Sequence, residues 1–307
     1  MGIAPYLKEI GRGKQGARSL DRAQAADLFG QILDGAVSDL EIGAFCIAMR
    51  VKGETPEEMA GFLDATAARM QRIPVAGARP AVVLPSYNGA RRLPALTPLL
   101  ALLLAREGLP VVIHGTATET RKVYVPEVLA ELANTAWTAI KTIAPGELAY
   151  VPTELLCPGL KRLLDVRRTI GLRNSAHSLV KLMNPCEGEA VVVGSYTHPE
   201  YAVSMGAVFQ LMGSTALLLR GTEGEVVADA RRVPQMEGFV RGERIVLESG
   251  ERGTVTDLPA LPAIDPPSTA AYIREVLAGN QPVPTAVALQ VEHILRLARA
   301  VQGTHQG

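Results

Sequence analysis

The chain has 307 residues, of which 48% are hydrophobic and 20% are charged, and its 31 basic residues balance its 31 acidic ones. This composition can bury a substantial core and excludes a largely disordered chain. The zero net charge argues mildly against nucleic-acid binding by the whole surface, but a local basic surface is compatible with it, because phosphate contacts depend on where the charges lie.

The first part of the chain, residues 1–72, is expected to be helical. Asp21 can cap a first helix, Asp39 a second, and Thr55, followed by Pro56, a third. Apolar residues recur at helical spacing in each of them, which predicts one packed face per helix. We therefore expect a small helical lobe at the N-terminus.

From residue 79 onward, short apolar strands alternate with segments of helix length. Residues 81–84 and 110–113 are expected to be strands of one sheet. The alternation is typical of an α/β fold with a mainly parallel central sheet. The predicted organisation is a helical lobe of residues 1–72 plus about 159–185, and a larger α/β lobe of residues 79–158 and 186–307.

The three cysteines, Cys46, Cys157 and Cys186, show no metal-ligand spacing. An odd number of cysteines in apolar surroundings indicates reduced thiols, so we expect a cytoplasmic protein. No run approaches the roughly 18 apolar residues that a membrane span requires, and no membrane partner is expected. No metal ion or other cofactor is predicted.

The helical part carries the most specific pattern in the chain. Its segments 32–39, 42–45, 48–50 and 52–61 are very similar to the helical lobe of anthranilate phosphoribosyltransferases and the related class II nucleoside phosphorylases. The match continues at 166–173 and 182–185 and resumes from 211 through 221. The resemblance implies their two-lobe fold, that of phosphoribosyltransferase class IV and nucleoside phosphorylase II.

The positions that serve catalysis in that family differ here. The family has a Gly-Thr-Gly-Gly-Asp loop that receives the diphosphate of phosphoribosyl pyrophosphate, where this chain has Pro85–Gly89. A lysine of the family is replaced by Ile113, and the acidic pair that holds magnesium by Val226 and Val227. A diphosphate leaving group needs cationic stabilisation, so the resemblance implies loss of ordinary phosphoribosyl transfer, and no catalytic residue is assigned.

Three further segments, 85–92, 171–177 and 220–225, resemble a paralogous group of anthranilate phosphoribosyltransferase-like proteins. This resemblance implies a homodimer that binds DNA or RNA, single- or double-stranded, without sequence preference, along a basic groove spanning the dimer. We expect the dimer to form mainly through the helical lobe, whose apolar residues exceed what a small bundle can cover.

Two groups of candidate site residues follow. The expected nucleic-acid contacts are Lys8, Arg12, Lys14, Arg18 and Arg22, for which the alternative is a solvated helix start. The candidate phosphate-binding residues are Ser86, Tyr87, Asn88, Gly89, Arg91, Arg92, His114 and Arg173. Tyr87 is expected at a loop tip, where it would stack on a base. For His114 and Arg173 a purely structural role is the alternative.

Two functions therefore stand side by side. In the first, a catalytically degenerate phosphoribosyltransferase fold binds nucleic acid as a dimer. In the second, a glycosyltransferase, phosphoribosyltransferase or nucleoside phosphorylase acts on a changed substrate, with Ser86, Asn88, Arg91 and His114 around a phosphate. The zero net charge weakens the nucleic-acid hypothesis. The loss of the acidic pair and of the glycines weakens the enzyme hypothesis more.

Overall fold

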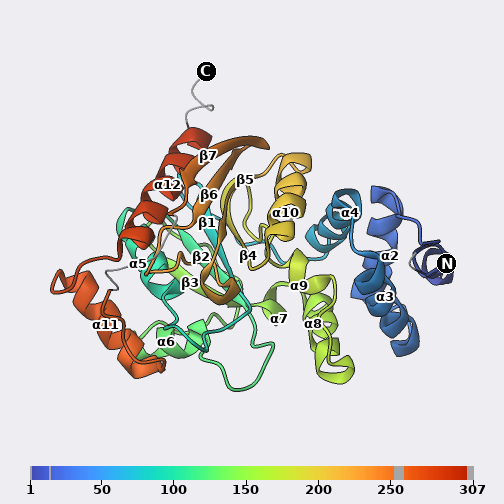
Figure 1. Ribbon diagram of the computed structural model, residues 1–307, viewed down its shortest axis with the longest axis horizontal. Coiled ribbons are helices and arrows are strands. Elements are labelled where there is room, and N and C mark those ends of the chain that lie inside the picture. The colour runs from blue at the N-terminus through green and yellow to red at the C-terminus, as the bar shows by residue number, and fades with distance from the viewer. Residues whose placement is uncertain (1, 14, 252–258, 303–307) are drawn as a thin grey trace.

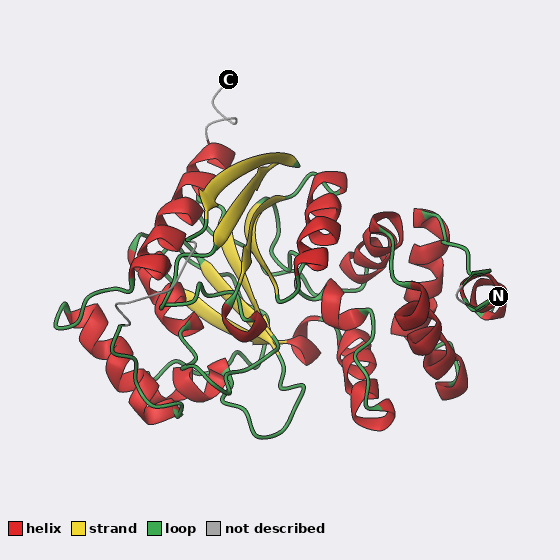
Figure 2. Ribbon diagram, viewed as in Figure 1, coloured by secondary structure: helices red, strands yellow, loops and turns green. Residues whose placement is uncertain are grey.

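The computed structural model describes residues 2–13, 15–251 and 259–302. Figure 1 shows a group of helices at the N-terminal side of a twisted sheet, and Figure 2 shows the same arrangement coloured by secondary structure. Two helices from the middle of the chain lie beside the first four. The helices of this group are α1 (Ala4–Ile10), α2 (Arg22–Asp34), α3 (Asp39–Lys52), α4 (Pro56–Ala67), α8 (Pro158–Ile170) and α9 (Ala176–Leu179).

Short sequence signals fix where these helices begin. As predicted, Asp21 and Thr55 are caps, since each accepts a backbone N–H of the first turn; each is also part of a capping box. The cap of α3 is Ser38 and not Asp39, because the Ser38 side chain accepts the N–H of Glu41. The stretch 159–185, which is expected in the helical lobe, contains two helices, since Gly171 adopts a left-handed conformation that ends α8.

The sheet has seven strands in the order β3-β2-β1-β4-β5-β6-β7. The first five are parallel, and β6 and β7 are antiparallel additions. Val82 pairs with Val111, so the two expected strands do lie in one sheet, and the predicted fold class is confirmed. The strands are β1 (Ala81–Ser86), β2 (Val111–Gly115), β3 (Leu148–Pro152), β4 (Ala190–Tyr196), β5 (Thr215–Arg220), β6 (Gln235–Val240) and β7 (Glu243–Ser249).

Helices cover both faces of the sheet. Alternate residues of β1 show this: Val82 and Leu84 pack into a core with α5 and α12, whereas Ala81 and Val83 pack into the core shared with α10 and the helical group. The remaining helices are α5 (Thr97–Arg106), α6 (Val125–Glu131), α7 (Thr153–Leu156), α10 (Pro199–Leu211), the short 3-10 helix η1 (Thr222–Gly224), α11 (Pro266–Ala278) and α12 (Thr285–Gln302). In the described part of the chain, none of the helices has the length and apolar character of a membrane span.

Candidate functional site

The direction of strand order reverses between β1 and β4, because β2 and β3 lie on one side of β1 and β4 and β5 on the other. In parallel sheets, ligands bind at such a switch point, at the carboxyl ends of the strands. Three loops leave the sheet at this edge. They are the β1 loop (residues 87–96), the β2 loop (residues 116–124) and the β5 loop (residues 221–234).

The carboxylate of Glu225, from the β5 loop, fills the space at the switch point. Its Oε2 accepts a hydrogen bond from Ser86 Oγ at 2.6 Å, and its Oε1 accepts the backbone N–H groups of Asn88 at 2.7 Å and Gly89 at 3.0 Å. Glu225 is only 4% exposed. The candidate phosphate donors of the β1 loop are therefore bound to an anion that belongs to the chain itself.

The buried ammonium of Lys181 binds the backbone next to Glu225. Lys181 donates to the carbonyl oxygens of Gly224 at 2.9 Å and Ser195 at 3.2 Å. Burial lowers the pKa of Lys181 to about 8, while the negative charge of Glu225 acts in the opposite direction. Gly224 has a φ of +86°, and a Cβ there would lie 1.9 Å from Nδ2 of the Asn88 side chain, so this turn requires glycine.

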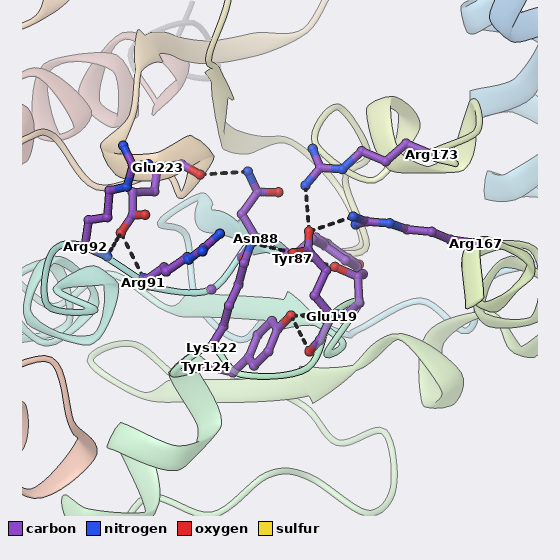
Figure 3. Close-up of polar contacts among 12 residues, drawn as sticks. Tyr87, Asn88, Arg91, Arg92, Glu119, Lys122, Tyr124, Arg167, Arg173 and Glu223 are labelled. Carbon is purple, nitrogen blue, oxygen red and sulfur yellow. Dashed lines mark hydrogen bonds and ion pairs between the residues drawn. The ribbon is translucent and has the colours of Figure 1, made fainter. Parts of the chain in front are cut away.

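A second carboxylate of the β5 loop, that of Glu223, binds the next part of the β1 loop. Its Oε2 accepts the consecutive N–H groups of Arg91 at 2.9 Å, Arg92 at 2.9 Å and Leu93 at 3.1 Å. Figure 3 shows the carboxylate over this stretch of backbone, with the side chains of Arg91 and Arg92 extending in different directions from it. Both arginine side chains are exposed.

Glu119 in the β2 loop contacts three cations (Figure 3). Its carboxylate lies 2.8 Å from Arg167, 3.2 Å from Lys122 and 3.5 Å from Arg173. Burial opposes ionisation of Glu119, but the hydrogen bonds from Lys122 and Arg167 outweigh it and hold its pKa below the ordinary value. Lys122 also donates to the carbonyl of Asn88, which links the β2 loop to the β1 loop.

Tyr87 does not stand at an exposed loop tip, so its predicted role as a stacking platform is wrong. The residue is 3% exposed, and its hydroxyl lies 2.8 Å from His114 Nδ1 and 2.9 Å from Thr153 Oγ1. His114 is fully buried, and burial lowers its pKa to about 3. A neutral, enclosed imidazole cannot supply the charge of a phosphate-binding cation, which leaves a structural role for this pair.

The buried imidazole of His114 is expected to make the fold sensitive to acid. The unfolded chain takes up this proton below about pH 6.5 and the folded chain does not, so stability falls as the pH falls from 6.5 towards 3. Between about pH 7 and about pH 5, the parent should lose about 2 kcal/mol more than a His114→Gln variant, in which the amide replaces the imidazole. Urea unfolding of both proteins at the two pH values measures this difference, and equal losses would contradict the assignment.

The residues expected to contact nucleic acid differ in their surroundings: some form ion pairs within the protein and others are exposed. Arg22 makes a bidentate ion pair with Asp64 of α4, at 2.6 and 2.8 Å, which engages its guanidinium in helix packing. Arg12 pairs with Glu9 at 2.7 Å. Lys8 and Arg18 are exposed, and their role stays a prediction, while Lys14 lies outside the described residues. The α1 helix is at the far end of the helical group, away from the switch point (Figure 1).

Sequence reasoning missed Glu119 and the roles of Glu223 and Glu225. Each acts on residues distant in sequence, since Glu225 binds Ser86 across 139 positions and Glu223 binds Arg91 across 132. The sequence alone presents the two β5-loop residues only as acids out of register with a magnesium pair. Among the described residues, no group of histidine, cysteine, aspartate or glutamate side chains is arranged to hold a metal ion.

Comparison with known proteins agrees with this architecture. Residues 4–70 match the glycosyl transferase family, helical bundle domain. Over 299 residues, the chain is 42% identical to the uncharacterized protein YbiB of Escherichia coli (strain K12), an alignment that covers 95% of this chain and 92% of YbiB. The chain belongs to glycosyl transferase family 3.

Other members of glycosyl transferase family 3 match along almost the whole chain. The anthranilate phosphoribosyltransferase of Sorangium cellulosum (strain So ce56) is 27% identical over 304 residues, covering 94% of this chain and 85% of that enzyme. The crystal structure of anthranilate phosphoribosyltransferase from Thermus thermophilus superposes with a TM-score of 0.75 at 21% identity, covering 97% and 89% of the two chains. The fold is therefore that of the anthranilate phosphoribosyltransferases.

Proposed function

We propose that this family member binds nucleic acid without sequence preference, as a homodimer, and does not transfer phosphoribose. The observation that carries the proposal is a local excess of positive charge at the switch point. The β1, β2 and β5 loops and residues 165–173 together contain nine cations and five carboxylates. The cations are Arg91, Arg92, Arg121, Lys122, Arg167, Arg168, Arg173, Arg231 and Arg232. Such a surface favours phosphate contact without reading of bases.

The position of Glu225 disfavours the altered-substrate enzyme. A phosphorylated sugar would need the Ser86, Asn88 and Gly89 donors, and these donors hold the Glu225 carboxylate. A second anion placed beside it would be repelled in a buried site. The exposed cations of the β1 and β2 loops lie outside this enclosed point, where a polymer backbone can reach them.

An apolar face on α3 supports the homodimer. Leu40 is 83% exposed, Ile47 is 43% exposed and Val51 is 59% exposed. Their spacing of seven and four residues places the three side chains on one side of the helix. Exposed apolar side chains gathered in this way are typical of an interaction surface, and pairing of two α3 helices would cover them.

Binding of labelled single- and double-stranded oligonucleotides across a salt series tests the proposed function. Affinity should fall linearly on a log–log plot, with a slope of about −0.9 per phosphate contact on duplex and about −0.7 on single strands. Sequences of different composition should bind alike. Absence of binding at roughly 50 mM salt, where these contacts are strongest, would overturn the proposal and favour the altered-substrate enzyme.

Matched variants locate the contacts. Arg91→Ala with Arg92→Ala should weaken binding to every sequence and flatten the salt slope by about two contacts. The control is Arg296→Ala with Arg299→Ala, an equal loss of charge from the exposed side of α12. Lys14→Ala with Arg18→Ala tests the N-terminal set in the same way. If only that last pair changes the slope, the basic groove lies on the helical part of the protein.

A further inference from the structure

The N–H groups of Arg91, Arg92 and Leu93 form an anion receptor distinct from the Glu225 pocket. Three consecutive backbone donors converge on one oxygen, Glu223 Oε2, within 3.1 Å. Successive backbone N–H groups that converge in this way bind oxyanions, including phosphate. These residues lie in a loop outside the regular helices and strands, so the receptor is made by the local turn of the backbone.

The Glu223 carboxylate is held less firmly in this receptor than the Glu225 carboxylate is in its buried pocket. Its backbone has a φ of +52°, in the left-handed region that residues other than glycine rarely adopt. Its side chain is partly exposed, whereas Glu225 is buried beside Lys181. Release of the Glu223 carboxylate would let water reach both the carboxylate and the three donors, so the carboxylate is placed to exchange with a solvent anion.

The receptor opens onto a large groove with an excess of arginine. Glu223, Arg92 and Leu93 line a cavity of about 1470 Å³ between the β5 loop, α10 and the strands β6 and β7. Two of its arginines are paired, Arg231 with Asp229 and Arg244 with Glu237. Five arginines and four carboxylates line the groove; the arginines are Arg92, Arg220, Arg231, Arg232 and Arg244. Without the Glu223 carboxylate, the lining would have five arginines and three carboxylates.

We propose that a phosphodiester group of the bound nucleic acid enters this groove and takes the place of the Glu223 carboxylate on the N–H groups of Arg91, Arg92 and Leu93. This inference rests on the proposed function and names the subsite that one backbone phosphate would occupy. Exchange of one anion for another keeps the three donors satisfied in both states. Arg92 also lines the groove and is exposed, so its guanidinium is available to the incoming phosphate.

Removing the resident carboxylate tests the subsite directly, with inorganic phosphate as the probe. In a Glu223→Ala variant without phosphate, the amides of residues 91–93 should exchange with deuterium faster than in the parent, because their acceptor is gone. Added inorganic phosphate should restore the protection of these amides. It should bind the variant roughly tenfold more tightly than it binds the parent. Glu223→Gln, which keeps a neutral acceptor, should give an intermediate result and serves if the alanine variant does not fold.

The control is Glu251→Ala, which removes one negative charge from the same groove without touching the three donors; Glu251 accepts the N–H of Val233 instead. Equal gains in phosphate and oligonucleotide affinity for Glu223→Ala and Glu251→Ala would overturn the subsite, because groove charge alone would explain them. Phosphate protection without oligonucleotide binding would support the subsite and refute the proposed function. Oligonucleotide binding without phosphate protection in either Glu223 variant would refute the subsite and leave the proposed function standing.

Discussion

Replacing Glu225 with alanine is expected to lower the free energy of unfolding by about 3–5 kcal/mol, the scale for breaking a buried charged pair or network. The change removes the acceptor of Ser86 Oγ and of the Asn88 and Gly89 N–H groups, all within a buried site. It also removes the negative charge that favours the buried ammonium of Lys181. Unsatisfied buried donors and an uncompensated buried charge are both costly, and their costs add in the same direction.

Denaturant unfolding of the parent and the variant measures this loss. Glu225→Gln is the matched control, because its carbonyl oxygen still accepts one or two of the three donors while the charge is lost. We expect it to fall between the parent and Glu225→Ala. A loss below about 1 kcal/mol for the alanine variant, the size of a single ordinary hydrogen bond, would show that water replaces the carboxylate and that the site is open.

Placing two acidic residues on the α3 face, in Leu40→Glu with Ile47→Glu, is expected to convert the protein from a dimer to a monomer of 32.6 kDa. Both side chains are exposed in the single chain, so the change should leave the fold of each protomer intact. Affinity for a long oligonucleotide should fall about 100-fold, because a second linked site raises overall affinity by at least that order.

Sedimentation or light scattering gives the mass, and oligonucleotide binding gives the affinity. Val246→Glu with Ile264→Glu makes the same chemical change at two other exposed apolar residues, on β7 and before α11, and should leave the mass unchanged. A parent that is already monomeric at micromolar concentration would contradict the dimer. A monomeric variant with full affinity would show that one protomer holds the whole nucleic-acid surface.

The parts of the fold predicted from sequence are those set by local signals. The caps at Asp21 and Thr55 and the apolar strands β1 and β2 are short-range patterns, and the structure has them as predicted. The helix α11 is harder to predict, because its proline pair lies in a proline-rich stretch that also fits a linker; in the structure Asp265 caps the helix and the prolines stand in its first turn. In β6, Glu237 and Gly238 interrupt the apolar run, and both are buried there.

The candidate site could be predicted only in its position. The loop after β1 was identified from sequence as the point of difference from the family. The burial of Tyr87 depends on His114 from β2 and on Thr153 from the end of β3, and no periodicity brings these three together. The carboxylates that bind the loop come from more than 130 residues away in the chain, so their role depends on the order of the strands in the sheet and not on any local pattern.

The two edges of the sheet differ from its interior in a way that bears on behaviour at high concentration. Beside the β7 edge, a register shift between Met236 and Glu237 of β6 disturbs the pairing of β6 with β7, and Glu243 and Glu248 place charges along β7 itself. At the β3 edge, Trp137 donates its backbone N–H to the carbonyl of Tyr150 and so occupies part of the open side. Both edges therefore resist addition of a strand from another molecule. For this reason, copies at high concentration should stay separate instead of joining edge to edge into fibres.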